Sequence, residues 1–69
     1  MRTIYTLVDS RGQPATCTVQ RVDDRWELTV RRGKGILLTE HHPVEETALA
    51  RAEAIRTALI GVSWRLREG

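Results

Sequence analysis

The sequence contains one cysteine, two prolines and no phenylalanine among its 69 residues. A single cysteine excludes an internal disulfide, and an unpaired thiol makes the cytoplasm the expected compartment. No run approaches the roughly 18 consecutive apolar residues that a membrane-spanning helix needs. The residues after Met1 also lack the continuous apolar segment of a secretory signal peptide. We therefore expect a cytoplasmic protein with no membrane partner.

Groups that would carry catalysis or bind a metal are equally scarce. His41 and His42 are adjacent, so in an extended segment their side chains point in opposite directions and suit a shared metal poorly. We expect them in an exposed loop, or His42 at the start of a helix. The segment Gly33–Gly35 lacks the remaining residues of a phosphate-binding loop, and no set of nucleophile, base and orienting group can be assembled. The sequence predicts a protein that is not an enzyme and has no metal or cofactor.

The length allows a single domain, residues 1–69. A chain of this size buries only about 60% of the surface that its unfolded form exposes, so its net stability is small. Disulfides are excluded, and association with a second copy is one way to bury more surface. A homodimer is therefore left open.

The first half of the chain alternates between apolar and polar residues, which is typical of strands with one buried face. The pattern predicts strands over 2–8, 15–22, 25–31 and 36–39, joined by turns rich in Asp, Ser and Gly. Tyr5 is the one aromatic residue that we expect to be able to face outward, since Trp26 and Trp64 fall on the inward positions.

After Pro43 the period changes to that of a helix, predicted over 44–60 with Gly61 just past its end. The apolar stripe along one side of this helix consists of Val44, Ala48, Ala52, Ile55 and Leu59. Residues 62–67 return to alternation and predict a last strand, which either completes the sheet or pairs with a second copy. The predicted fold is α+β, a small antiparallel sheet in the order β-β-β-β-α-β with one amphipathic helix packed on one face.

One helix covers one face of a sheet, so the other face stays open. Residues 25–34 carry four positive groups and one negative group. A basic, hydroxyl-rich face suits phosphates or an acidic protein surface, although an ordinary solvated face has the same pattern. The candidate partner-binding residues, on this face and in the nearby turn that contributes Arg32 and Lys34, are Arg25, Glu27, Arg31, Arg32, Lys34, Arg65 and Arg67.

A second candidate surface lies on the helix. Leu49 and Ile60 fall outside the predicted core side, on either side of Arg56. Isolated apolar residues on a surface carry no meaning, but together these three can form the edge of a contact patch.

The segments Trp26–Val30 and Glu45–Ala52, within three antiparallel strands followed by a helix, resemble the arm-binding domains of phage-type integrases and a family of plant DNA-binding domains. The resemblance covers about residues 15–60 and implies a sheet whose open face reads DNA. The strand predicted over 62–67 departs from the pattern of those families, so no functional residues are carried over.

These observations predict a small non-catalytic binding protein that acts through protein–protein interaction. The composition, with ten arginines and one lysine, suits a prokaryotic or phage genome. One interpretation is therefore a phage- or mobile-element-encoded inhibitor or regulator of a host complex, like anti-CRISPR proteins in kind. The alternative is a nucleic-acid-binding module that uses the basic open face of the sheet, and a third possibility is a structural dimer.

Overall fold

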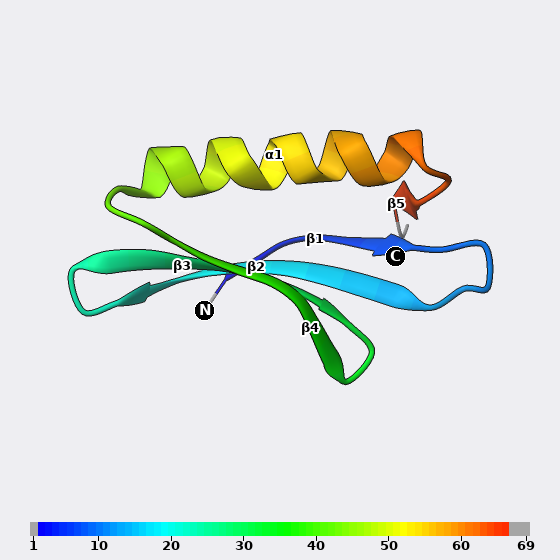
Figure 1. Ribbon diagram of the computed structural model, residues 1–69, viewed down its shortest axis with the longest axis horizontal. Helices are drawn as coiled ribbons and strands as arrows, with labels where there is room; N and C mark the ends of the chain where they lie inside the picture. Colours follow the sequence, from blue (N-terminus) through cyan, green and yellow to red (C-terminus); the bar gives the residue numbers. More distant parts are fainter. Residues whose placement is uncertain (1, 67–69) are drawn as a thin grey trace.

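The computed structural model describes residues 2–66 and has the predicted element order (Figure 1). The elements are β1 (Arg2–Val8), β2 (Pro14–Val22), β3 (Arg25–Arg32), β4 (Gly35–His42), α1 (Glu45–Gly61) and β5 (Arg65–Leu66). All pairs are antiparallel, and the five strands lie in the order β4-β3-β2-β1-β5. The last strand therefore completes the domain's own sheet by pairing with β1.

The core lies between the sheet and α1, which runs across one face of the sheet (Figure 1). Two alanines of α1, Ala48 and Ala52, are fully buried, and their small side chains let the helix approach the strands closely. The buried cluster consists of Tyr5, Leu7, Cys17, Val19, Leu28, Val30, Ala48 and Ala52. Trp26 and Trp64 pack against its rim, as the alternation of their strands predicts.

The helix differs from the prediction at both ends. Val44 is its N-cap and is 49% exposed, so it is not part of the core. Gly61 is its last residue, not the residue after it, because the backbone N–H of Val62 still bonds to the carbonyl of Leu59 and that of Ser63 to the carbonyl of Ile60. Ser63 then adopts a φ of 82°, which turns the chain back toward the sheet and leaves only Arg65–Leu66 as a strand.

β4 is twice as long as the predicted strand over 36–39. It continues through His41 and His42, so the expectation of an exposed loop or a helix N-cap there is wrong. Each imidazole has a carboxylate partner on its own side of the strand, Glu27 for His41 and Glu40 for His42. These partners hold the segment extended until Pro43.

Irregularities interrupt the outer parts of the sheet. The register of β1 shifts between Thr3 and Tyr5, which leaves Ile4 as an extra residue. This β-bulge reverses the facing of the residues before it, and Tyr5 lies opposite Cys17 in the core. The prediction that Tyr5 can face outward is wrong, because its hydroxyl donates a 2.8 Å hydrogen bond to the backbone carbonyl of Ala52.

Candidate functional site

The face of the sheet opposite α1, called the open face here, is neutral at its centre. Four threonines lie side by side across four strands, because Thr3, Thr18, Thr29 and Thr39 are in register. Thr18 and Thr29 are only 7% and 4% exposed although α1 lies on the other side of the sheet. These two central threonines therefore offer a partner little accessible surface, whereas Thr3 and Thr39 at the sides of the row are exposed.

The next row of the open face is occupied by an internal hydrogen-bond network. Glu27 accepts a 3.0 Å bond from Gln20 Nε2, and its other oxygen lies 3.2 Å from His41 Nε2. The bond from Gln20, with that of His41, outweighs the effect of burial and holds the pKa of Glu27 below its ordinary value. Glu27, a candidate partner-binding residue, therefore links three strands within the structure.

The remaining candidate partner-binding residues lie at different positions along the length of the molecule. Arg25 begins β3, in register with Val22 and beside the acidic turn of Asp23 and Asp24. Arg31 lies six residues further on, about 20 Å away along an extended strand. The two arginines share the open face but belong to opposite ends of the sheet, so they do not form one site.

Arg32 does not face the open side. It is in register with the buried Ala15, and its guanidinium reaches Asp9 Oδ2 at 2.8 Å and lies 5.6 Å from the ring centre of Trp64. The backbone N–H groups of Gln13 and Arg11 also donate to Asp9. The bond from Gln13, with those from Arg11 and Arg32, outweighs burial and lowers the pKa of Asp9. Arg32, predicted to lie in the turn beside the open face, is the last residue of β3 and lies on the helix side, where it ties together three chain segments.

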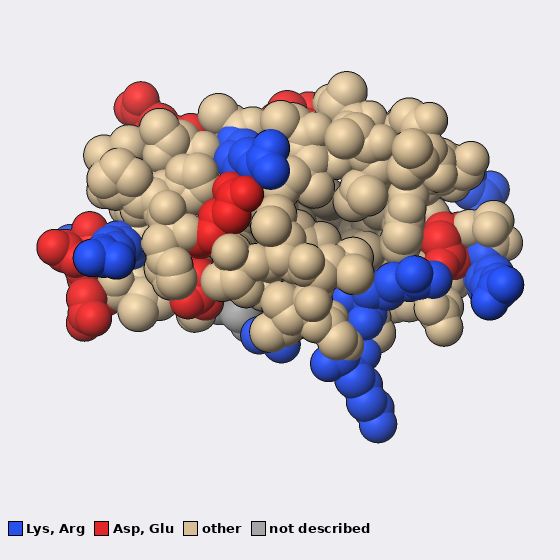
Figure 2. All heavy atoms as spheres, in the orientation of Figure 1, with Lys and Arg blue, Asp and Glu red and all other residues tan. Residues whose placement is uncertain are grey.

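The end of the molecule that carries this contact is strongly basic. The strand pairing places Arg65 opposite Val8 and Val8 opposite Pro14, whose carbonyl accepts a bond from the Gly33 N–H. Among residues 2–66, five cations and one acid, Asp9, therefore lie at this end of the sheet. The cations are Arg11, Arg31, Arg32, Lys34 and Arg65, and we call this region the basic end. Figure 2 shows Lys and Arg at the lower right, where Figure 1 places the β3–β4 turn and the β1–β2 loop.

Most cations of the basic end are available to a partner. Within residues 2–66, Arg32 is the one member of the five that has an ion-pair partner, and the other four are exposed. Arg67, the remaining candidate, lies outside the described residues. In the view of Figure 2, most of the acidic groups lie at the other end, on the left.

Exposed apolar residues accompany these cations. Ile36 and Leu37 are 56% and 54% exposed at the start of β4, and Ile36 is in register with Arg31. The reason is a second bulge: Leu38 pairs with Val30, and Leu37 is the extra residue. We call Arg31, Lys34, Ile36 and Leu37 the hairpin-tip patch. Exposed Ile60 and Val62 lie at the end of α1, which meets the same end of the sheet. Sequence alternation alone misses the patch, because a bulge leaves no pattern in it.

The predicted contact at the helix edge does not form one surface. Leu49 packs against the core, and Arg56 forms an ion pair with Glu53 on the same helix. Ile60 is the one of the three that remains an exposed apolar side chain. Assigning Leu49 to an exposed edge is therefore wrong: a 17-residue helix buries only two alanines fully and needs larger flanking side chains to close the core.

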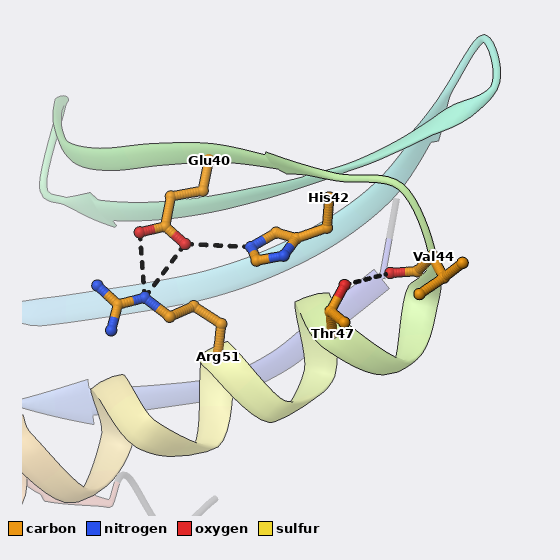
Figure 3. A network of polar contacts seen from close by, with 5 residues as sticks. All are labelled: Glu40, His42, Val44, Thr47 and Arg51. Atoms are coloured by element: carbon orange, nitrogen blue, oxygen red, sulfur yellow. Dashed lines mark hydrogen bonds and ion pairs between the residues drawn. The ribbon is translucent and has the colours of Figure 1, made fainter.

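The opposite end of the molecule holds β4 against α1 (Figure 3). Glu40 accepts bonds of 3.1 and 3.0 Å from Arg51 Nε of the helix, and His42 Nε2 lies 3.1 Å from it. Burial raises the pKa of Glu40, but the bonds from His42 and Arg51 outweigh it, so the net shift is downward. One turn before Arg51, Thr47 donates to the carbonyl of Val44. These contacts join two elements and leave little free bonding capacity.

A shallow hollow of about 300 Å³ lies near this junction, lined by Asp24, Arg25, His41, His42 and Pro43. Among residues 2–66 no three His, Cys, Asp or Glu side chains come close enough together to hold a metal ion. Cys17 is buried, and burial raises the pKa of its thiol. The basic end, by contrast, combines four exposed cations that have no ion-pair partner within the described residues with exposed Ile36 and Leu37.

The described part of the chain contains no helix that is long and apolar enough to cross a membrane. Comparison of the chain with protein-family models, with curated protein sequences and with solved structures finds no match.

Proposed function

We propose that this chain is a non-catalytic binding protein that docks on an acidic surface of a partner protein through its basic end. One observation carries the proposal: exposed arginine and lysine side chains lie beside exposed isoleucine and leucine in the hairpin-tip patch. The fully buried centre of a protein interface is more apolar than the rest of the surface, and arginine is enriched there.

The apolar residues favour a protein over a nucleic acid as the partner. A surface that binds phosphates needs cations but gains little from Ile36 and Leu37. Binding to single strands commonly uses exposed aromatic rings on which bases stack. Tyr5 is in the core, and both tryptophans pack against it. Nucleic-acid binding, the alternative predicted from the sequence, therefore serves as the competing outcome of the test.

A protein of this kind acts by occupying a surface that its partner needs for another contact. Inhibition or regulation of a host complex, as the sequence suggests, is one form of this action and stays a prediction. The basic end contributes at least four exposed cations to such a contact, so we expect binding to weaken as salt screens the charges.

Two matched double variants test the proposal. Arg31→Glu with Lys34→Glu reverses the hairpin-tip patch, and Arg21→Glu with Arg25→Glu makes the same change in charge at the opposite end. Each tagged variant and the native chain capture partners from a host lysate with and without nuclease. We expect a partner protein that the native chain and the Arg21/Arg25 control retain and that the Arg31/Lys34 variant loses.

Retention of that partner by the Arg31/Lys34 variant contradicts docking through the basic end. If nuclease releases everything that was captured, the nucleic-acid alternative replaces the proposal. Circular dichroism of each variant checks that the fold is intact, since all four substituted residues are exposed.

A further inference from the structure

β4 has an open backbone edge. It is the outermost strand of the sheet, and among residues 2–66 no strand pairs with its other side. Along such an edge, alternate backbone N–H and C=O groups point away from the sheet and can accept a further strand. Added strands are a recurring form of peptide recognition, in which the main chain supplies affinity and the side chains supply specificity.

The bulge at Leu37 limits where a strand can add. The register of β4 against β3 shifts by one residue at Leu37: before it Gly35 and Ile36 pair with Arg32 and Arg31, and after it residues 38–42 pair regularly with residues 26–30. Bulges protect edges against indiscriminate pairing, so an added strand is confined to about five residues. One end of that strand then lies beside the exposed Ile36 and Leu37.

Charge selects the kind of segment that fits. Arg31 and Lys34, beside the end of the regular run, form no ion pair within the described residues. On the helix side of β4 the one carboxylate, Glu40, is already bonded to Arg51. An added strand therefore meets unpaired positive charge at the hairpin tip and no unpaired carboxylate of β4 itself on the helix side.

We propose that the partner's contact is an extended acidic segment that pairs with residues 38–42 of β4 and places carboxylates near Arg31 and Lys34. This inference rests on the proposed function and adds the conformation and chemistry of the bound segment. Apolar side chains at alternate positions of the segment face the helix side, beside Leu38. One apolar residue at its end contacts Ile36 and Leu37.

A synthetic peptide, acetyl-Glu-Val-Glu-Val-Glu-Val-amide, is the probe. One derivative carries N-methyl groups on its three glutamate amides and a second carries them on its three valine amides. In an extended strand these two sets of N–H groups point to opposite sides. Only one set can face β4, so we expect one derivative to bind at least about tenfold more weakly, from loss of several hydrogen bonds. The other should bind within about twofold of the parent peptide.

Affinity is measured by NMR titration of the full chain, and amide exchange gives a second reading. Alternate amides between residues 38 and 42 should exchange more slowly in the complex. A peptide with lysine in place of glutamate is the charge control and should not bind, and the Arg31→Glu, Lys34→Glu variant should not bind the acidic peptide.

The outcomes separate this inference from the proposed function. The acidic peptide can bind the native chain and not the Arg31/Lys34 variant while its two methylated forms bind equally well, or while neither form binds. In either case strand addition is wrong, and docking at the hairpin-tip patch stands. If the acidic peptide does not bind, the inference fails, and the capture experiment then decides on its own whether the basic end binds a partner.

Discussion

At the scale of single residues, this small core depends on polar side chains that find internal partners. Tyr5 contributes its ring to the apolar cluster and its hydroxyl to a helix carbonyl, so it links β1 to the middle of α1. Asp9 likewise links separate segments: in the β1–β2 loop it accepts hydrogen bonds from two backbone N–H groups and from Arg32 of β3. A chain without disulfides gains order from such cross-links between segments that are distant in sequence.

We expect Tyr5→Phe to lower the free energy of unfolding by about 1 kcal/mol, because the ring stays buried while one internal hydrogen bond is lost. Urea denaturation followed by circular dichroism measures the change. Thr57→Ala is the control, since it removes an exposed hydroxyl from α1 and should change stability by less than about 0.5 kcal/mol. Equal effects of the two substitutions would contradict the role given to the Tyr5 hydroxyl.

Tyr5 also makes the free energy of unfolding depend on pH in the alkaline range. Burial, and then the neighbouring Cys17, raises the pKa of Tyr5 above its ordinary value of about 10. The folded state therefore holds this proton more tightly than the unfolded state. The resulting stability is complete below about pH 10 and is lost as the pH rises further. Stability measured from pH 9 to pH 12 should fall less steeply for Tyr5→Phe than for the native chain.

At the scale of elements, α1 docks through small residues. Ala48 and Ala52 are fully buried, whereas Ala50 and Ala54 lie on its exposed side. The distance between helix and sheet is therefore set at two positions that leave no room for a longer side chain.

Ala52→Leu should destabilise the fold by about 1–3 kcal/mol, because the added atoms force α1 away from the sheet. Ala54→Leu adds the same atoms on the solvent side and should change stability by less than about 0.5 kcal/mol. Thermal or urea unfolding of the pair distinguishes packing from helix propensity, which is identical in the two variants. Similar losses in both would show that α1 is not held at this spacing.

The elements themselves could be predicted from the sequence because their side chains follow two clear periods. Trp26, Leu28 and Val30 alternate in β3, and Ala48 and Ala52 are spaced as one helix face requires. The bulges at Ile4 and Leu37 could not be predicted, since an extra residue leaves no trace in composition or period. The errors on the facing of Tyr5 and on the length of β4 concern strands that carry these bulges.

The candidate site was predicted less well for a related reason. Alternation tells which side of a sheet a residue faces, and it correctly groups Arg25 with Arg31 on one face. It does not tell whether two residues on the same face, here at opposite ends of β3, contribute to one binding surface. Arg32 differs in parity from Arg31, and this signal alone could have placed it on the helix side. The contacts of Arg32 with Asp9 and Trp64 depend on a loop and a turn that no local pattern specifies.

At the scale of the whole molecule, net charge conceals the arrangement that matters. The formal charge is only +2, yet within the described part of the chain five cations and one acid lie at the basic end. Surface charges further apart than about 8 Å are largely screened at physiological salt. A partner at one end of a molecule that is 37 Å long therefore interacts mainly with the charges of that end.

Chromatography on heparin tests this arrangement without any partner. Arg31→Gln with Lys34→Gln and Arg21→Gln with Arg25→Gln both reduce the net charge from +2 to zero. If the basic end dominates retention, the Arg31/Lys34 variant elutes at lower salt than the Arg21/Arg25 variant. Elution of both at the same salt concentration would mean that net charge alone governs the interaction.

The separation of charge between the two ends also has a consequence for the proposed docking on an acidic surface. It gives the molecule a permanent dipole directed along its longest axis, and the field of an acidic surface exerts a torque on such a dipole before contact. The molecule then rotates during its approach so that the β3–β4 turn leads, and a larger fraction of collisions begins in the productive orientation. Rapid association at low ionic strength is thus compatible with a protein of almost neutral overall charge.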